Sequence, residues 1–217
     1  MIPFEPLWDQ YKRIIKKHRP IVLFGQEPFS SNLRLSNLSW YKYDWYWRKS
    51  RPSGFMSAKL KPLKDIEIIT VFSSGTTANC SPNNMTYHPQ GLKDDAYVWK
   101  RPQYYTGSEG VNPYHKSHKL EREVSKSGYP RQVLDFANPN KEVLHPTQKP
   151  IDLLEYLINT YSVAGNLVLD NCMGSGSTGI AALNLGRRFI GIEKDEVHFE
   201  TAKNRIDNHK VRKRFFT

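Results

Sequence analysis

Apolar positions along the chain follow two periods, and these predict helices and strands near both ends of the sequence. Apolar residues recur every three or four positions over 4–18 and over 150–163, which is the spacing of a helix that buries one face. Two shorter helices are predicted over 177–185 and 195–208. Apolar runs predict strands at 21–24, 40–48, 66–72, 167–170 and 188–193.

Two of the predicted strands carry further information. The run at 21–24 is continuously apolar, which favours a strand buried on both faces of a parallel sheet. The run at 40–48 is rich in aromatic residues, and Trp40, Trp45 and Trp47 alternate with polar ones. We expect these tryptophans in the core rather than as platforms for stacked bases.

The pattern almost disappears between about 73 and 141, where Gly, Pro, Ser, Asn, Tyr, Lys and His dominate. This stretch is far longer than an ordinary connection inside a compact domain. We therefore expect a functional insertion or a partly disordered segment.

Composition adds a strong charge bias to this picture. The 217 residues contain 32 Lys and Arg against 21 Asp and Glu, a net charge of +11. The excess favours a polyanionic partner, nucleic acid first and an acidic membrane surface second. No apolar run is long enough to span a membrane and no signal peptide is recognised, so we expect a cytoplasmic protein with no membrane partner.

The two cysteines, Cys80 and Cys172, are far apart and match neither a zinc-binding spacing nor a disulfide framework. We expect two small thiols that are buried or half-buried, and no metal site.

A glycine-rich turn, DNCMGSGSTG at 170–179, stands between a predicted strand and a predicted helix. Gly174, Gly176 and Gly179 have the spacing of a turn that offers backbone N–H groups to a nucleotide. Glu193 follows Asp170 by 23 residues, where a carboxylate can accept both hydroxyls of a ribose. In the alternative interpretation the glycines only allow tight packing and Glu193 caps a helix.

Two details favour S-adenosylmethionine (SAM) over a dinucleotide. Asp170 would repel a pyrophosphate but attract a sulfonium and an α-ammonium group. The stretch LHPTQKP at 144–150 places His, Thr, Gln and Lys between prolines, a rigid lip that could receive an amino-acid carboxylate. Alternatively, this stretch is a helix-entry loop in which Thr147 is the cap.

The segment that runs from HPTQKPIDLLEYL through DNCMGSGSTG to FIGIEKDEVHFETAKNRI resembles the C-terminal part of amino-methylating DNA methyltransferases. It is similar to their permuted β class, in which the catalytic motif comes first, the target-recognition insertion follows and the SAM site comes last. The resemblance covers 144–207 most specifically and extends through the IPFEPLWDQYKRI helix, the IVLFG strand and the aromatic segment. Residues 80–140 contribute little to the resemblance.

The resemblance implies an α/β Rossmann-like SAM-dependent methyltransferase fold with a permuted motif order and a loop-rich target-recognition insertion. Such an enzyme transfers a methyl group from SAM to adenine N6 or cytosine N4 in double-stranded DNA. The resemblance divides the chain into four parts. They are an N-terminal half of the catalytic domain (1–75), a target-recognition insertion (76–141), a SAM-binding βαβα unit (142–209) and a basic tail (210–217).

The resemblance also assigns a set of residues to the cofactor. They are His145, Thr147, Gln148, Lys149, Asp170, Met173, Gly174, Gly176, Ser177 and Glu193. Here the sequence departs from the family, which has Asp-Pro-Phe where this chain has Asp170-Asn171-Cys172. We expect the loss of the Pro to loosen the turn and the loss of the Phe to remove an apolar wall.

The family's catalytic motif, Asp-Pro-Pro-Tyr or Ser-Pro-Pro-Tyr, does not occur in the sequence, which has no Pro-Pro dipeptide. No catalytic residue is identified, since Asn112-Pro113-Tyr114 is only a superficial match. The family's sheet places the motif-bearing strand between the strands at 167–170 and 21–24. Without it, these two strands would meet directly or leave an unpaired edge. A misplaced gene start, a fragment, a protein completed by a second chain and a non-catalytic relic all remain open, as does a homodimer.

Basic residues in two loops are the candidates for DNA contacts. They are Lys49, Arg51, Lys59, Lys61, Lys100, Arg101, Lys116, Lys119 and Arg122, with Tyr104, Tyr105 and Tyr114 between some of them.

The sequence is compatible with three functions. Adenine-N6 methylation of DNA is preferred over cytosine-N4 methylation, because the aromatic segment and IPFEPLW are most similar to the adenine enzymes. A non-catalytic subunit that binds DNA or SAM is the alternative from another class. A nicotinamide dehydrogenase comes third, disfavoured by Asp170 and the basic insertion.

Overall fold

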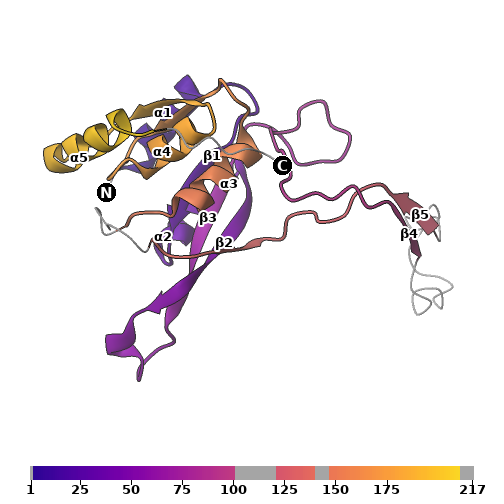
Figure 1. The fold of residues 1–217 in the computed structure, drawn as a ribbon, viewed down its shortest axis with the longest axis horizontal. Helices are drawn as coiled ribbons and strands as arrows, with labels where there is room; N and C mark the ends of the chain where they lie inside the picture. The colour runs from indigo at the N-terminus through magenta and orange to yellow at the C-terminus, as the bar shows by residue number, and fades with distance from the viewer. Residues whose placement is uncertain (1, 101–120, 140–146, 211–217) are drawn as a thin grey trace. The chain divides into compact units, whose positions relative to one another are not determined.

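The computed structural model describes residues 2–100, 121–139 and 147–210. The chain divides into two compact units, unit 1 with Met1–His88 and Arg131–Thr217 and unit 2 with Pro89–Pro130 (Figure 1). The helices of unit 1 are α1 (Phe4–Ile14), α2 (Phe29–Leu35), α3 (Ile151–Tyr161), α4 (Ser177–Asn184) and α5 (Glu196–Asp207), with a 3₁₀ turn, η1 (Phe55–Ser57). Its strands are β1 (Ile21–Gly25), β2 (Tyr41–Ser53), β3 (Lys64–Phe72), β6 (Val133–Phe136), β7 (Leu167–Asp170) and β8 (Arg188–Gly191).

The described strands of unit 1 form two sheets. The first has the order β1-β3-β2-β6, in which β3 is antiparallel to both neighbours and β6 is parallel to β2. The second pairs β7 and β8 in parallel, from Leu167 opposite Arg188 to Asp170 opposite Gly191. The elements alternate as the sequence pattern predicts, but α2 and β6 were not predicted.

The parallel environment expected for the strand at 21–24 is wrong. Its described partner is β3, which runs antiparallel from Ile21 opposite Phe72 to Gly25 opposite Ile68. The continuous apolar run has another cause. Ile21 packs in a cluster with α1, whereas Phe24 packs against two clusters that contain α3.

β1 and β7 each have one edge without a partner among the described residues. β1 is an outermost strand of the four-stranded sheet, and β7 pairs only with β8. The side chains of Leu167 and Leu169 on β7 are exposed, at 51% and 38%. Of the two outcomes expected for the missing strand, the structure therefore has the unpaired edges, which are costly in a folded protein.

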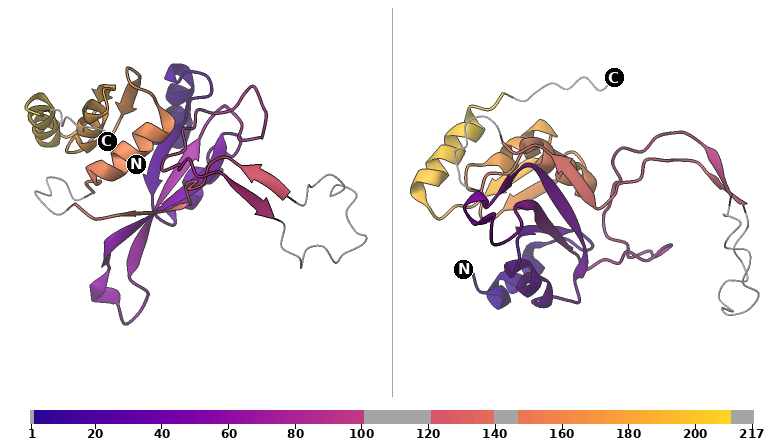
Figure 2. Two further views of the ribbon diagram at one scale, coloured as in Figure 1. Left: turned by 45° about the vertical axis from the view of Figure 1, so that its right-hand side comes forward. Right: turned by 90° about the horizontal axis from the view of Figure 1, so that it is seen from below.

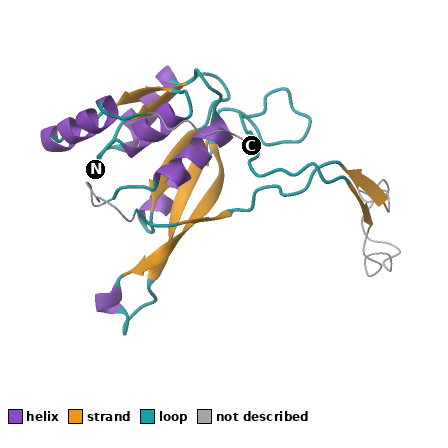
Figure 3. Cartoon of the chain, in the orientation of Figure 1, coloured by secondary structure: helices purple, strands orange, loops and turns teal. Residues whose placement is uncertain are grey.

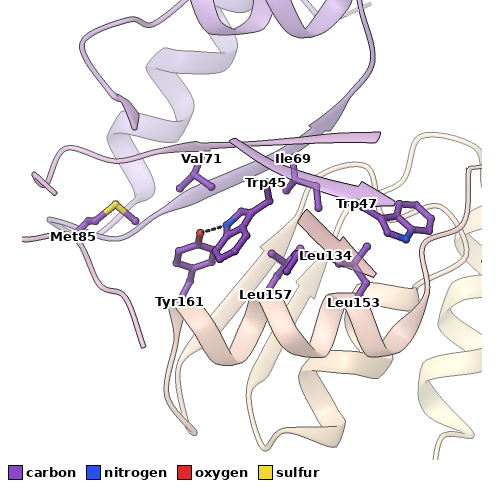
Figure 4. Close-up of a cluster of buried hydrophobic side chains, with 9 residues drawn as sticks. All are labelled: Trp45, Trp47, Ile69, Val71, Met85, Leu134, Leu153, Leu157 and Tyr161. Atoms are coloured by element: carbon purple, nitrogen blue, oxygen red, sulfur yellow. Dashed lines mark hydrogen bonds between the residues drawn. The ribbon is translucent and has the colours of Figure 1, made fainter. Parts of the chain in front are cut away.

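Helix α3 packs against both sheets. One side carries Leu153, Leu157 and Tyr161 into a cluster with β2 and β3 (Figure 4). The other carries Leu154 and Ile158 into a cluster with α4, joined by side chains of β7 and β8. The helix therefore fixes the glycine turn that follows β7 relative to the large sheet.

Two of the three tryptophans at 40–47 lie in the core, as the sequence predicted. Trp45 and Trp47 are buried in the cluster of Figure 4, and Trp40 is half-buried against the cluster around α1. In that second cluster the ring of Trp8 packs edge-on against Phe72, with the centroids 4.8 Å apart. The prediction of core tryptophans is confirmed for Trp45 and Trp47.

The helix predicted over 4–18 ends four residues early, at Ile14. Ile15 is already extended, with φ −75° and ψ 139°. Ile14 is exposed, and Ile15 packs against the cluster around α1 from outside the helix.

The expected burial of the cysteines is wrong. Both Cys80 and Cys172 are exposed and free. Cys80 lies in a loop with φ 59°, and Cys172 lies in the glycine turn beyond the end of β7. Neither position packs into a cluster.

The described part of unit 2 contains an antiparallel pair of strands, β4 (Tyr97–Lys100) and β5 (Glu121–Val124), in register from Tyr97 opposite Val124. Figure 2 shows this ribbon and the loops on either side of it. An isolated bridge between Lys93 and Ser127 continues the pairing. Loops otherwise dominate the described part of 76–141 (Figure 3). The assignment of this range to target recognition stays a prediction.

Candidate functional site

The glycine turn begins at Asp170, whose carboxylate is held by the turn itself. One oxygen, Oδ1, accepts the backbone N–H of Cys172 at 3.0 Å. The other, Oδ2, accepts the hydroxyl of Thr178 at 2.6 Å. A carboxylate has about four acceptor positions, so Asp170 keeps capacity for a ligand.

Asn171 stands where the resemblance expected a Pro, and it contacts α1. Its Oδ1 accepts the hydroxyl of Tyr11 at 3.0 Å. Burial raises the pKa of Tyr11 to about 12, so the phenol remains a donor at neutral pH. The turn is therefore tied to α1 at the position where the loss of the Pro was expected to loosen it.

The glycines are required by the backbone of the turn. Gly174 and Gly176 have φ 51° and 74°, in the left-handed region that side chains disfavour. Gly176 is the N-cap of α4, and its N–H donates to the carbonyl of Met173 at 2.8 Å. Met173 is buried against Gly191, where any Cβ would collide with its sulfur.

Glu193 lies two residues beyond the end of β8 and closes the turn. Its Oε2 accepts the N–H of Gly174 at 2.9 Å, and its Oε1 accepts the N–H groups of Lys194 and Asp195. These backbone donors, led by Asp195, lower the pKa of Glu193. The alternative in which Glu193 caps the next helix is wrong, because the side chain of Asp195 is the cap of α5.

Helix α5 contacts the glycine turn through Arg205, which was not predicted as a site residue. Its Nη1 donates to the carbonyl and the hydroxyl of Ser175, at 2.9 and 3.3 Å, and to the hydroxyl of Ser177 at 3.0 Å. Thr178 was missed as well.

The lip before α3 contacts the glycine turn directly. Oε1 of Gln148 accepts the hydroxyl of Ser175 at 3.1 Å. The alternative that makes Thr147 a helix cap is wrong, since Pro150 is the N-cap and no side chain caps the helix there. His145 lies outside the described residues.

Lys149, the last polar residue of the lip, faces the large sheet. Its Nζ lies 2.6 Å from Oε1 of Glu67 and 5.1 Å from the centroid of the Phe24 ring. Glu67 is buried on β3 and also binds Lys49 of β2 at 2.8 Å. Glu67 was not predicted, because a single acid in an apolar strand has no distinctive sequence pattern.

The residues predicted for DNA are scattered. Lys49 is paired with Glu67, and its side chain is 14% exposed. Arg51, Lys59 and Lys61 are exposed at the far part of the β2–β3 hairpin. Lys100 and Arg122 belong to β4 and β5, but their side chains are not described. The remaining candidates lie outside the described residues: Arg101, Tyr104, Tyr105, Tyr114, Lys116 and Lys119.

Within residues 2–100, 121–139 and 147–210, no helix is long and apolar enough to cross a membrane. The same ranges contain no group of three or more His, Cys, Asp or Glu side chains that could hold a metal ion.

Comparison with solved structures gives the same fold. The chain superposes on the crystal structure of an M1.HpyAVI–SAM complex with a TM-score of 0.61 and 23% identity, covering 94% of this chain and 85% of that one. A second match is the cytosine-N4-specific PvuII DNA methyltransferase, with a TM-score of 0.62 and 14% identity over 96% and 72% of the two chains.

Sequence comparisons point to one family. The chain is 46% identical over 63 residues to the type II methyltransferase M2.DpnII of Streptococcus pneumoniae, and 43% identical over 63 residues to M2.LlaDCHI of Lactococcus lactis subsp. cremoris. These matches cover 29% of this chain and 24% and 23% of those relatives, so they span about a quarter of each relative's length. A family model described as DNA methylase matches residues 3–204. Because that match spans nearly the whole sequence, the chain belongs to the N6/N4 DNA methylase family.

Proposed function

We propose that this chain binds S-adenosylmethionine at the glycine turn and serves the transfer of its methyl group to an amino group of a base in double-stranded DNA. Adenine N6 is the preferred target, and cytosine N4 is the alternative. The observation that carries the proposal is the pair of carboxylates, Asp170 and Glu193, held on either side of a turn with two left-handed glycines.

The residues present fit this cofactor by their chemistry. The carboxylate of Glu193 accepts hydrogen bonds from three backbone N–H groups, so about one acceptor position remains for a ribose hydroxyl. Asp170 keeps about two positions and a negative charge toward a cationic sulfonium or ammonium group. A dinucleotide fits less well, because its pyrophosphate would meet the same charge.

Each part of the site has a distinct task. When bound, the cofactor supplies an electrophilic methyl group. Asp170 and Glu193 orient it by charge and hydrogen bonds, while Arg205 holds Ser175 and Ser177 in place. Gln148 and Lys149 connect the lip to the glycine turn on one side and to Glu67 on the other.

The residues that act on the base are not found in this sequence. We propose that a segment with Asp-Pro-Pro-Tyr or Ser-Pro-Pro-Tyr, outside residues 1–217, adds a strand beside β1 and β7. The unpaired edges of these strands and the exposed Leu167 and Leu169 support this proposal. The segment is either encoded upstream or belongs to a second chain. We expect the complete enzyme in the cytoplasm of a bacterium or a phage-infected cell, where its DNA lies.

A direct test measures SAM binding and methyl transfer separately. Calorimetry with the purified chain should show SAM binding that is lost in Asp170→Asn and unchanged in the exposed Asp207→Asn. With labelled SAM and duplex DNA, the chain alone should transfer little label, and addition of the motif-bearing segment should restore transfer. Absence of SAM binding, or preferential binding of a nicotinamide, would contradict the proposal.

The second candidate is a non-catalytic subunit that binds DNA and SAM. It is favoured by the absence of a Pro-Pro dipeptide from the sequence. Translation of the DNA upstream of Met1 separates the two. An in-frame Asp-Pro-Pro-Tyr would favour the enzyme. An immediate stop codon, together with failure of any added segment to restore transfer, would favour the subunit.

A further inference from the structure

The β2–β3 hairpin ends in an apolar tip that nothing in the described structure covers. Phe55, Met56 and Leu60 are exposed at 66%, 104% and 88%. Met56 and Leu60 are the two most exposed large apolar residues of the described chain. Figure 1 shows this end of the hairpin, with η1, pointing away from the helices of unit 1. Burial of such side chains against a partner is favourable, so an exposed apolar surface of this kind indicates a partner.

The tip is ordered by its own backbone. The N–H groups of Ser57, Ala58 and Leu60 donate to carbonyls three residues earlier, at 3.0, 3.1 and 2.9 Å. Gly54 begins the turn with φ 94°, which a side chain would disfavour. The apolar side chains are therefore presented on a preorganised turn, which lowers the entropy lost when they bind.

The residues on either side of the tip are basic. Between 48 and 64 the sequence has six Lys or Arg and no acid: Arg48, Lys49, Arg51, Lys59, Lys61 and Lys64. Arg48 and Lys49, near the base of the hairpin, are paired with Asp135 and Glu67. Lys59, Lys61 and Lys64 are exposed close to the tip.

The apolar tip and the lysines beside it are complementary to duplex DNA. Lysines contact the phosphates on both sides of a groove, and apolar side chains such as Phe, Leu and Met enter between base pairs and unstack them. An apolar protein surface would complement the tip but not the lysines around it.

We propose that Phe55, Met56 and Leu60 form a wedge that enters duplex DNA between base pairs, with Lys59, Lys61 and Lys64 on the adjacent phosphates. This inference rests on the proposed function for its partner, double-stranded DNA. Glu67, which lies opposite Trp47 within the hairpin, binds Lys149 of the lip, so the hairpin and the cofactor turn belong to one connected set of contacts. An enzyme that flips a base must unstack the duplex, and the wedge supplies part of that work.

The test uses the 217-residue chain and three matched variants. The wedge variant is Phe55→Ser with Met56→Ser and Leu60→Ser, and the charge variant replaces Lys59, Lys61 and Lys64 by Gln. The control replaces Leu35 and Leu38 by Ser, because these leucines are exposed to a similar degree outside the hairpin. Circular dichroism and thermal melting should show that all variants fold, since the altered side chains lie on the surface.

Two readouts separate the wedge from the charges. The affinity for a duplex, measured by anisotropy at several salt concentrations, should fall about tenfold in the wedge variant with an unchanged salt slope. In the charge variant the slope itself should decrease by about 2–3. The fluorescence of 2-aminopurine in a duplex should increase when the wild type binds, because the base unstacks. It should not increase when the wedge variant binds. The conservative Met56→Leu should retain the increase.

The remaining outcomes would overturn the inference. If the wild type and the wedge variant bind the duplex with equal affinity and increase the 2-aminopurine fluorescence equally, the proposed wedge is wrong. The proposed function would then be unaffected. Tip-dependent binding to anionic vesicles, or tip-dependent self-association on gel filtration, without an effect on DNA would assign the tip to another partner. Failure of the wild type to bind DNA at all would remove the proposed function as well.

Discussion

Nζ of Lys149 lies 2.6 Å from Oε1 of Glu67, and this ion pair joins the lip of the cofactor site to the central strand β3. Glu67 is buried and shared with Lys49, so one acid balances two lysines. We expect Glu67→Gln to leave two half-buried ammonium groups without a counter-charge. The free energy of unfolding should fall by about 1–3 kcal/mol, less than for a fully buried pair because both lysines can still reach water.

The same substitution should also weaken SAM binding. Lys149 no longer has a fixed position, and Gln148 beside it contacts Ser175 of the glycine turn. The dissociation constant for SAM should rise about fivefold, on the order of 1 kcal/mol. Calorimetry checks this against Asp65→Asn, an exposed acid on the same strand. A variant that is destabilised but binds SAM normally would confine Glu67 to a role in folding.

The hydroxyl of Tyr161 is the partner of a buried indole. It accepts the N–H of Trp45 at 2.6 Å and lies 3.0 Å from the hydroxyl of Tyr43 (Figure 4 shows the first contact). Tyr161→Phe leaves the indole N–H unsatisfied, which costs about 1–3 kcal/mol. In a chain of this length the melting temperature should fall by roughly 2–4 °C per kcal/mol.

Tyr43→Phe is the matched control for this substitution. It removes a hydroxyl from the same pair but leaves the acceptor for Trp45 in place. Its effect on the melting temperature should therefore be clearly smaller. Equal effects of the two variants would show that the contact between the hydroxyls, and not the indole, carries the stability.

Gly179 has no room for a methyl group. A Cβ there would lie 2.6 Å from Cδ1 of Ile206 and 2.8 Å from Cε1 of Phe189. We expect Gly179→Ala to lower the free energy of unfolding by about 1–3 kcal/mol through overpacking. Ile206→Val removes the nearest atom, so the double variant should recover part of the loss. Urea unfolding of the four proteins of this cycle measures the coupling, and strict additivity would contradict the proposed collision.

The local elements were readable from the sequence because their cause is local. The strand at 167–170 and the helices at 151–161 and 196–207 follow apolar periods and nearby Pro or Gly residues, and the structure has them within two residues. The glycine turn was predictable for the same reason. Left-handed backbone at Gly174 and Gly176 is a property of a few consecutive residues.

What the sequence could not show depends on long-range contacts. The antiparallel pairing of β1 with β3 and the place of β6 beside β2 join segments far apart in the chain. Glu67, Thr178 and Arg205 acquire their roles only from partners that folding brings near them. The pattern of a single residue and its neighbours contains no such information, so these residues were missed.

The stability of the glycine turn should depend on pH through Glu193, whose pKa is lowered by backbone N–H groups. A carboxyl group with a lower pKa in the folded state contributes stability that is fully present above its unfolded pKa. That contribution is lost as the pH falls through the folded value. The difference in unfolding free energy between the wild type and Glu193→Gln should therefore be larger at about pH 7 than at about pH 3. Urea titrations at both pH values measure it, and a difference that does not change with pH would show that the hydrogen bonds, not the charge, account for the role of Glu193.

Arg205 should be needed for the shape of the cofactor site more than for the fold. Its guanidinium makes three hydrogen bonds to Ser175 and Ser177 from outside the turn. Arg205→Lys keeps the charge but replaces the planar guanidinium, whose Nη1 makes all three contacts, by an ammonium group on a flexible stem. We expect the dissociation constant for SAM to rise about tenfold, with a change in melting temperature of only a few degrees. Lys203→Ala, an exposed cation on the same helix, is the control and should leave both values unchanged. If Arg205→Lys binds SAM as tightly as the wild type, the glycine turn holds its shape without support from α5, and the residues of the turn alone determine the site.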